Sequence, residues 1–553
     1  GGNGRAVSRG ARTVISKLRR PGTGPRAAAC DPRPAPPAPA KTVSRLSAAL
    51  AIAAVALLAF VHVPYPFDDD QGLFAYGARA IAHGAHLYLD FWDLKQPAIY
   101  WYYAVAGSIF GFDEVGIHVF DLLWMCGLAI VLLRIGMRAF RAPLLAAVTP
   151  LLCLAPFYAK AEPIHLAQVE IVAVLPIASV LLLLLRAAPA APATAWRYAA
   201  AGALTVSVMA FKIVLAPIPA LLILVSLLHA TLNGRGTLRD ALLRGVLPAA
   251  AGAVAAAIPL LAYLWHAGIL GPALWVAFVY PRLALAEYPW QPLATLADSA
   301  AWFWSAERFV LPFALVGLWS EIVMRRSLLG RLALAWLVVG CLVLLIQVLS
   351  WWQYHFDLFF VPLGLLAVAG IATLGELLAR RPGARWFPAA ACSALLLTVA
   401  VSIVHKVQRY WLAGASPFSD PMAFMIRVEP RMRAIADGAA FLAAPGARPG
   451  TIANLGDPRM FLYANRPAIL AVNGSGYMLA GQWRDAAALL ERERPVYIYL
   501  GDDTRFVWSH AGDAIGKLVA TRYVLRRRDG RRGEWHELRA AGPSALAVSR
   551  GPP

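Results

Sequence analysis

The chain has 553 residues, of which 59% are hydrophobic and 15% are charged. A soluble globular protein is typically about 45–50% apolar and about 25% charged, so this composition excludes an ordinary soluble protein and indicates a polytopic α-helical membrane protein. The formal net charge is +20, but the basic residues lie mainly between apolar segments, where they set orientation in a membrane; we therefore expect no nucleic-acid partner.

The first 45 residues contain the stretch RPGTGPRAAACDPRPAPPAPAK, which is rich in Pro, Ala and Arg. Such a composition cannot bury enough apolar surface to form a core. We therefore predict that residues 1–45 form a disordered, basic cytoplasmic tail that lies beside anionic lipid.

The next part of the chain, residues 46–405, is predicted to be a transmembrane domain. A spanning helix needs about 20 mostly apolar residues, and we predict about eleven such helices. The predicted spans are 46–65, 115–137, 142–160, 168–186, 197–211, 213–230, 244–266, 309–324, 331–350, 356–379 and 386–405.

The aromatic segment QPAIYWYYAVAGSIFGF at 96–112 is short and ends without basic residues. If it does not span, five basic loops lie on the same side as the N-terminal tail. Cytoplasmic loops carry the excess of Lys and Arg, so we predict an interfacial or re-entrant helix here. The N-terminus is then cytoplasmic, and the loop 66–114 lies on the outer face.

The last part, residues 406–553, is polar enough to be soluble. The stretches TIANLGDPRMFLYANRPAILAV and ERPVYIYLGDD are typical of β-strands with turns, and a hairpin is predicted around Asp529 and Gly530. We expect a small soluble α/β domain on the periplasmic or extracellular side.

Polar residues that membrane helices do not need gather on the predicted outer face. Charged groups in apolar segments are costly and usually functional. They are Asp68, Asp69 and Asp70 at the start of the first outer loop, Lys95 at its end, Glu170 near the outer end of the fourth span, Lys212 between the fifth and sixth spans, and Tyr354, His355 and Asp357 at the start of the tenth.

Each of these residues also has a purely structural explanation. Acidic residues are favoured at a helix N-terminus, and Lys95 could extend its ammonium group to the interface. His355 lies beside Trp351 and Trp352 and could be an interfacial anchor. As a set, however, carboxylates can act as general bases or hold a divalent cation, and lysines can hold a phosphate. The set therefore favours group transfer from a lipid-linked phosphate donor.

The stretch DDDQGLFAYGARAIAHGAHLYLDFWDLKQPAIYWYYAVAGSIFGFDEVGIHVF resembles the first outer loop of the integral-membrane (GT-C) glycosyltransferases. It is most similar to the dolichyl-phosphate-mannose protein mannosyltransferase and lipid A aminoarabinose transferase type. The family's acidic pair corresponds to Asp69 and Asp70, or to Asp70 and Gln71. The helix after it corresponds to LFAYGARAIAHG, and the family's Lys-Pro-Pro step is here Lys95-Gln96-Pro97.

Later positions fit the same resemblance, which covers roughly residues 46–380. An outer-loop acid corresponds to Glu170, a lysine after the fifth span corresponds to Lys212, and a Tyr/His step before a Pro-bearing helix corresponds to Tyr354 and His355 in YHFDLFFVP. The resemblance implies a GT-C fold for the predicted domain of about eleven transmembrane helices. The predicted soluble α/β domain resembles no known domain, although a soluble outer domain after the helices is common in this fold.

The resemblance also implies residue roles. Asp69 or Asp70 is the general base of an inverting transfer, Glu170 and Lys95 position the acceptor or a cation, and Lys212, His355 and Arg282 hold the donor phosphate. Some relatives bind a divalent metal ion near the acids and others do without one; Mg, Mn or Zn at Asp69, Asp70 and Glu170 is therefore an open alternative.

The implied partners are a polyprenyl-phosphate sugar donor, a lipid, glycan or protein acceptor, and membrane lipid. The implied location is the bacterial cytoplasmic membrane. The competing hypothesis is a polytopic transporter or lipid flippase. A transporter places its ionisable residues near the bilayer midplane on broken helices, whereas here they gather at one surface.

Overall fold

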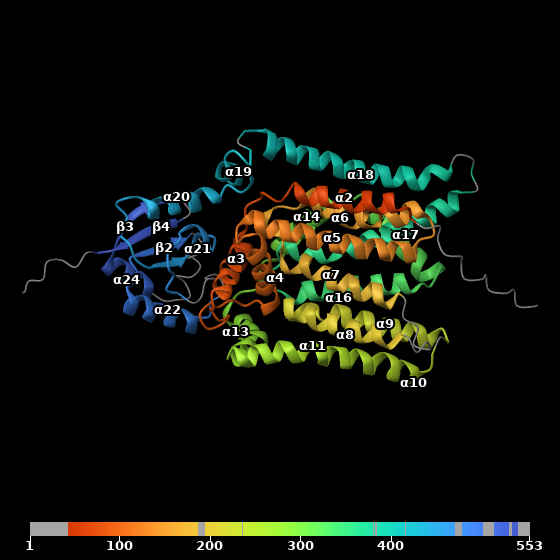
Figure 1. The fold of residues 1–553 in the computed structure, drawn as a ribbon, viewed down its shortest axis with the longest axis horizontal. Helices are drawn as coiled ribbons and strands as arrows, with labels where there is room; N and C mark the ends of the chain where they lie inside the picture. The colour runs from red at the N-terminus through yellow and green to blue at the C-terminus, as the bar shows by residue number, and fades with distance from the viewer. Residues whose placement is uncertain are drawn as a thin grey trace, which may run out of the picture. The chain divides into compact units, whose positions relative to one another are not determined.

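The computed structural model describes residues 43–185, 194–234, 236–379, 381, 384–414, 416–470, 478–501, 514–529 and 533–539. Most of the predicted N-terminal tail lies outside these residues. Every segment predicted to span the membrane contains a helix. Figure 1 shows the long helices of this part running side by side.

The helices that match the predicted spans have the following bounds: α2 Arg45–Phe60, α5 Glu114–Ala139, α6 Pro143–Lys160, α7 Val169–Leu184, α8 Ala195–Phe211, α9 Pro217–Leu232, α10 Leu238–Ala241 continuing into α11 Leu247–His266, α15 Leu311–Trp319, α16 Leu328–Ile346, α17 Phe360–Leu378 and α18 Phe387–Lys406.

Seven helical segments among the described residues are long and apolar enough to cross a membrane. They are Glu114–Ala139, Pro143–Lys160, Ile213–Leu232, Leu238–His266, Leu328–Ile346, Gln353–Leu378 and Ala384–Leu412. Three shorter apolar helices are Arg45–Phe60, Val169–Leu184 and Leu311–Met324. The protein is therefore a multi-pass membrane protein, and the count of eleven spans stays a prediction.

Close helix packing depends on small residues at two crossings. A Cβ atom on Gly202 of α8 would collide with the backbone of Ala249 on α11, and one on Gly252 of α11 would collide with the backbone of Ala199. Gly317 of α15 and Gly370 of α17 meet in the same reciprocal way. Small residues let membrane helices approach closely, because packing rather than the hydrophobic effect drives their association in lipid.

The segment predicted as the first outer loop folds into two helices, α3 (Asp69–Ala82) and α4 (Pro97–Phe110). Helix α4 corresponds to the predicted helix at 96–112 and packs against α3, α5 and α8. Its interfacial or re-entrant position stays a prediction. The chain between α11 and α15 contains α12 (Leu270–Leu274), α13 (Tyr280–Glu287) and α14 (Leu293–Glu307), and a 3-10 helix, Gln353–Phe359, precedes α17.

The C-terminal part contains a four-stranded mixed sheet in the order β1-β2-β4-β3. Strand β1 (Ile452–Leu455) pairs in parallel with β2 (Tyr497–Gly501), and β4 (Gly533–Leu538) is antiparallel to β2 and to β3 (Tyr523–Arg528). The two strands of the predicted hairpin are confirmed, whereas Gly530 lies outside the described residues. The segment after β1 is not all strand as predicted, because it includes a short helix, α21 (Met460–Tyr463).

Helices cover both faces of this sheet (Figure 1). Helix α20 (Met432–Ala443) packs on the face that carries Tyr497, Tyr499 and Trp535. Helices α22 (Ala480–Glu493) and α24 (Ala514–Arg522) pack on the opposite face. A further helix, α19 (Pro421–Val428), comes before α20. The sheet belongs to the same compact unit as the membrane helices, so the separate domain 406–553 and its outer location stay predictions.

Candidate functional site

The run of three aspartates forms the first turn of α3. Asp68 is the N-cap, and its backbone N–H donates to Gln71 Oε1 at 3.1 Å in a capping box. The amide of Gln71 donates in turn to the carbonyl oxygens of Pro163 and Leu166. Because unpaired N–H groups and the helix dipole favour negative charge at a helix N-terminus, this position stabilises part of the crowded negative charge.

Asp70 faces a lysine and a tyrosine. Its Oδ2 atom lies 3.3 Å from Nζ of Lys95 and accepts a hydrogen bond from the Tyr354 hydroxyl at 3.3 Å. Lys95 comes from the end of the same outer loop, and Tyr354 comes from the 3-10 helix before α17. The structure therefore brings together three residues that the sequence analysis selected from distant parts of the chain.

The backbone around Lys95 is held by buried side chains. The Tyr88 hydroxyl donates to the carbonyl oxygen of Lys95 at 2.7 Å. Asp93 Oδ2 accepts the Tyr100 hydroxyl at 2.6 Å and the Lys95 backbone N–H at 3.4 Å. Burial raises the pKa of Asp93, and the nearby Lys95 and Tyr100 oppose that shift. Asp93 was not among the predicted site residues, although it lies two residues before Lys95.

A second polar cluster joins three further predicted residues. Nζ of Lys212 lies 2.6 Å from Oε1 of Glu170 and 3.3 Å from Nε2 of His355. Nε2 of His355 lies 3.4 Å from the same Glu170 oxygen. Glu170 and His355 are each only 1% exposed, so Lys212 supplies the positive charge that a buried carboxylate needs.

The two clusters are neighbours. Tyr354, which bonds to Asp70, is followed directly by His355, which lies beside Glu170, and the two rings are 4.6 Å apart. The side chain of Gln96, next to Lys95, accepts a hydrogen bond from the Ile213 backbone N–H, next to Lys212, at 3.2 Å. The result is one polar region that combines two carboxylates, two lysines, a histidine and a tyrosine.

Asp69 faces a different group of residues. Its Oδ1 lies 3.0 Å from Nη2 of Arg459, and its Oδ2 lies 3.5 Å from Nη1 of Arg431. Nη2 of Arg431 also pairs with Asp68 at 2.7 Å. Both arginines come from the C-terminal part, more than 350 residues after the aspartates in the sequence. Sequence reasoning missed them, because no local pattern distinguishes them from the many other arginines of that region.

Arg282 does not join either cluster. It is exposed on α13, and the described part of the chain gives it no hydrogen bond or ion pair. Its helix does lie beside the first outer loop, because the ring of Tyr280 packs edge-on against Trp92 with centroids 5.4 Å apart. The role of Arg282 in donor binding therefore stays a prediction without a contact to support it.

The three acids proposed for a metal ion are not arranged around a common point. Asp69 faces arginines, Asp70 faces Lys95, and Glu170 is paired with Lys212. Within the described ranges, no group of three or more His, Cys, Asp or Glu side chains is suited to hold a metal ion. These residues do not fit the expected divalent-metal site, and we derive no chemical step from a metal.

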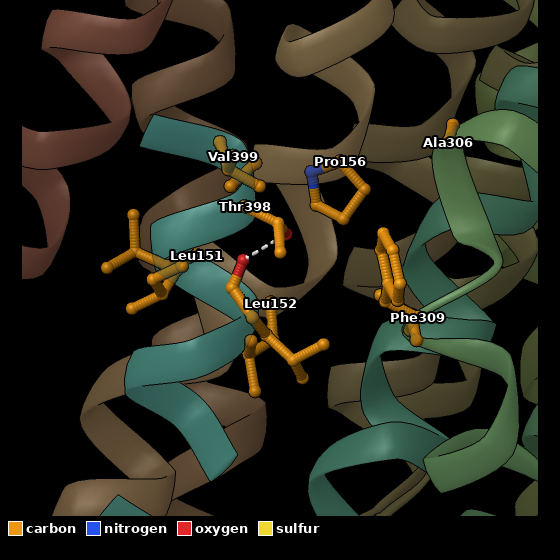
Figure 2. Close-up of a pocket in the computed structure, with 11 residues that line it drawn as sticks. Leu151, Leu152, Pro156, Ala306, Phe309, Thr398 and Val399 are labelled. Atoms are coloured by element: carbon orange, nitrogen blue, oxygen red, sulfur yellow. Dashed lines mark hydrogen bonds between the residues drawn. The ribbon is translucent and has the colours of Figure 1, made fainter. Parts of the chain in front are cut away.

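An apolar pocket lies elsewhere, between α6, the segment 306–310 and α18. Its lining includes Leu152, Pro156, Phe309 and Val399 (Figure 2). The hydroxyl of Thr398 donates to the Leu395 carbonyl oxygen of its own helix at 2.7 Å. None of the predicted site residues lines this pocket, and the Thr398 hydroxyl in its lining is already bonded within α18.

No protein-family model matches the sequence, and no curated protein matches it either. Among solved structures, ArnT from Cupriavidus metallidurans bound to undecaprenyl phosphate matches with a TM-score of 0.55 and 15% identity, over 90% of this chain and 99% of that chain. The apo state of the same protein matches with a TM-score of 0.54 and 17% identity over the same shares. The arabinofuranosyltransferase AftD from mycobacteria is more distant, with a TM-score of 0.43, 14% identity and coverage of 91% and 40%.

The likeness to ArnT confirms the resemblance to GT-C membrane glycosyltransferases at the level of the fold. It extends over nearly the whole of ArnT, whereas the motifs in the sequence covered the membrane part alone.

Proposed function

We propose that the protein is a membrane glycosyltransferase that moves a sugar from a polyprenyl-phosphate donor to an acceptor on the outer face of the bacterial cytoplasmic membrane. One observation carries the proposal: the carboxylate of Asp70 lies beside Lys95 and Tyr354, next to the cluster of Glu170, Lys212 and His355. The fold supports the choice of donor, because the similar structure of ArnT is one bound to undecaprenyl phosphate.

In the proposed reaction, an acceptor hydroxyl attacks the anomeric carbon of the sugar from the side opposite the phosphate. The new bond joins the acceptor oxygen to that carbon, the bond to the phosphate oxygen breaks, and the configuration inverts. The proton of the hydroxyl passes to a carboxylate, and the lipid phosphate leaves with the bonding electron pair. A positioned base of this kind typically accelerates a reaction by about 10²–10⁴-fold.

Asp70 is the better candidate for the base than Asp69. A base must take up a proton, and the positive charges of Arg431 and Arg459 beside the Asp69 carboxylate oppose that uptake. Among the described residues, the ion pair and the hydrogen bond given for the Asp70 carboxylate are those with Lys95 and Tyr354, each at 3.3 Å. Asp69 stays the alternative base.

The lysines are proposed to stabilise the leaving phosphate. An ammonium group has three N–H donors, so Lys212 can keep its bond to Glu170 while it donates to a phosphate oxygen. Nε2 of His355 lies within 3.4 Å of Lys212 Nζ and of Glu170 Oε1, and would hold these two side chains in place. Glu170 and Lys95 would position the acceptor, which is a lipid, a glycan or a protein.

A transfer assay tests the proposal directly. The purified protein in nanodiscs receives a panel of radiolabelled polyprenyl-phosphate sugars and a membrane extract as acceptor, with and without EDTA, beside the Asp69→Asn/Asp70→Asn double variant. Label that enters a new product only with intact aspartates supports the transferase and identifies the donor. Lipid that changes leaflet in proteoliposomes, without transfer from any donor, would instead favour a flippase.

A further inference from the structure

A short C-terminal segment, Asp457–Tyr463, lies along α3. The ring of Phe461 stacks on Tyr76 with centroids 4.8 Å apart and an interplanar angle of 26°. Nη2 of Arg79 donates to the carbonyl oxygen of Phe461 at 3.4 Å, and the Tyr463 hydroxyl donates to Glu114 at the start of α5. The segment thus contacts α3 and the helix that follows the outer loop.

Arg459 is the centre of this contact. It is fully buried, and its Nε donates to both carboxylate oxygens of Asp457 at 2.9 and 3.1 Å. Its Nη1 donates to the carbonyl oxygen of Phe67 at 3.0 Å, and its Nη2 lies 3.0 Å from Asp69. Burial disfavours the charged form of Asp457, but the charge and hydrogen bonds of Arg459 outweigh it and lower the pKa of Asp457. The guanidinium therefore links a charged C-terminal turn to residues directly before and within the first turn of α3.

A glycine on α3 makes room for this arginine. A Cβ atom on Gly72 would lie 2.6 Å from Cγ and 3.2 Å from Cα of Arg459. Glycine inside a helix is less favourable than alanine, because it loses more conformational freedom on folding. Its presence at position 72 is explained by the close approach of the Arg459 backbone and side chain to the helix.

We propose that Arg459 is a positioning residue of the active site, so that the C-terminal part completes the catalytic loop. This inference rests on the proposed function. Asp69 and Asp70 are adjacent on α3, and successive residues of an α-helix project about 100° apart. When Arg459 holds Asp69 and the Phe67 carbonyl, the direction of Asp70 toward Lys95 and Tyr354 is fixed as well. Arg431, also from the C-terminal part, pairs with Asp68 and Asp69.

Two variants test this role by different routes. Arg459→Met removes the guanidinium group. This variant could impair folding, because Asp457 and Asp69 then lack the positive charge of Arg459. Gly72→Ala keeps every charge but displaces Arg459. The matched control is Gly481→Ala on α22, where a Cβ atom would meet nothing closer than 3.8 Å.

The measurements are hydrogen exchange of the α3 amides, kcat and KM for the donor, and binding of undecaprenyl phosphate. Both variants should exchange faster over residues 69–82 and lose at least about tenfold in kcat with little change in KM, since misplacing a catalytic group by about 1 Å can cost about 10²-fold. Gly481→Ala should match the wild type.

If the α3 amides of both variants exchange at the wild-type rate, the inference is overturned. Faster exchange in α3 with an unchanged kcat would overturn it as well. If the wild-type protein transfers no sugar from any donor, the proposed function fails. Hydrogen exchange still decides in that case whether Arg459 holds α3, so the two failures are distinguishable.

Discussion

Nζ of Lys95 lies 3.3 Å from Oδ2 of Asp70, whereas Asp69, one residue earlier, pairs with arginines from the C-terminal part. Adjacent carboxylates on one helix therefore have different partners. Like charges in close proximity disfavour the ionised form unless opposite charges compensate them. This division explains how three consecutive aspartates are tolerated.

We expect Asp70→Asn to lower kcat by about 10²–10⁴-fold, the usual contribution of a general base. Asparagine has the shape of aspartate and still accepts a hydrogen bond from Lys95, but it cannot take the acceptor's proton. The thermal midpoint and the KM for the donor should stay close to those of the wild type. Radiolabel transfer measures kcat and KM, and a thermal melt in nanodiscs measures the midpoint.

The matched control for this prediction is Asp69→Asn, which weakens the contact with Arg459 but leaves Asp70 intact. It should retain a larger share of the activity. A strong loss in Asp69→Asn with full activity in Asp70→Asn would move the base to Asp69, and full activity in both would contradict a carboxylate base in this pair.

The buried pair of Lys212 and Glu170 contributes to stability and, in the proposed function, to phosphate binding. Two variants measure these contributions separately. Lys212→Met leaves Glu170 without its cation, and breaking a buried pair in this way typically costs about 3–5 kcal/mol. The double variant Lys212→Met/Glu170→Gln removes both charges and should recover most of the stability. Undecaprenyl phosphate should bind weakly to both variants, because neither has the ammonium group.

Thermal melts and a lipid-binding assay measure these two effects. If the double variant binds undecaprenyl phosphate as the wild type does, Lys212 has a structural role alone and the phosphate is held elsewhere.

Much of the site could be predicted from sequence, because its residues conflict with their surroundings. Glu170 and Lys212 are charged residues inside apolar runs, and such residues need partners. The structure shows that they partner each other. In the same way, the long apolar runs between positions 46 and 405 predicted where helices form, since membrane helices require them.

Other contacts could not be predicted, because they join residues that are far apart in the sequence. Arg459 lies 390 residues after Asp69, and its local sequence is typical of a turn. Arg282 is the opposite case: it lies in a segment rich in aromatic residues, the structure leaves it exposed, and its role in donor binding stays a prediction. Residue type and predicted side of the membrane selected it, and neither determines the direction of a side chain.

We expect a modest effect from Tyr354→Phe. The variant removes the hydroxyl that donates to Asp70 at 3.3 Å and leaves the ring beside His355. A hydrogen bond to a charged group contributes about 1.5–3 kcal/mol, and this long one should be at the low end, so kcat should fall by about tenfold.

The matched control is Tyr263→Phe on α11, where the ring packs against Trp101 with centroids 5.0 Å apart. It should leave kcat unchanged. A loss as large as that of Asp70→Asn would indicate that the Tyr354 hydroxyl itself takes part in proton transfer, contrary to the assignment made here.

Glu307, at the end of α14, is 1% exposed, and neither of its carboxyl oxygens has a hydrogen-bond partner among the described residues. Burial raises the pKa of Glu307 from 4.5 to about 8. The folded protein therefore keeps this proton at pH values where the unfolded chain has lost it. The stability that results is fully present below about pH 4.5 and is lost as the pH rises to about 8.

Glu307→Gln cannot ionise, so its thermal midpoint should rise relative to that of the wild type as the pH is raised from 5 to 8. Each pKa unit corresponds to about 1.4 kcal/mol, so melts at four pH values would resolve the trend. A difference that stays constant across this range would mean that Glu307 is already ionised in the folded protein and has a cation or water as its partner.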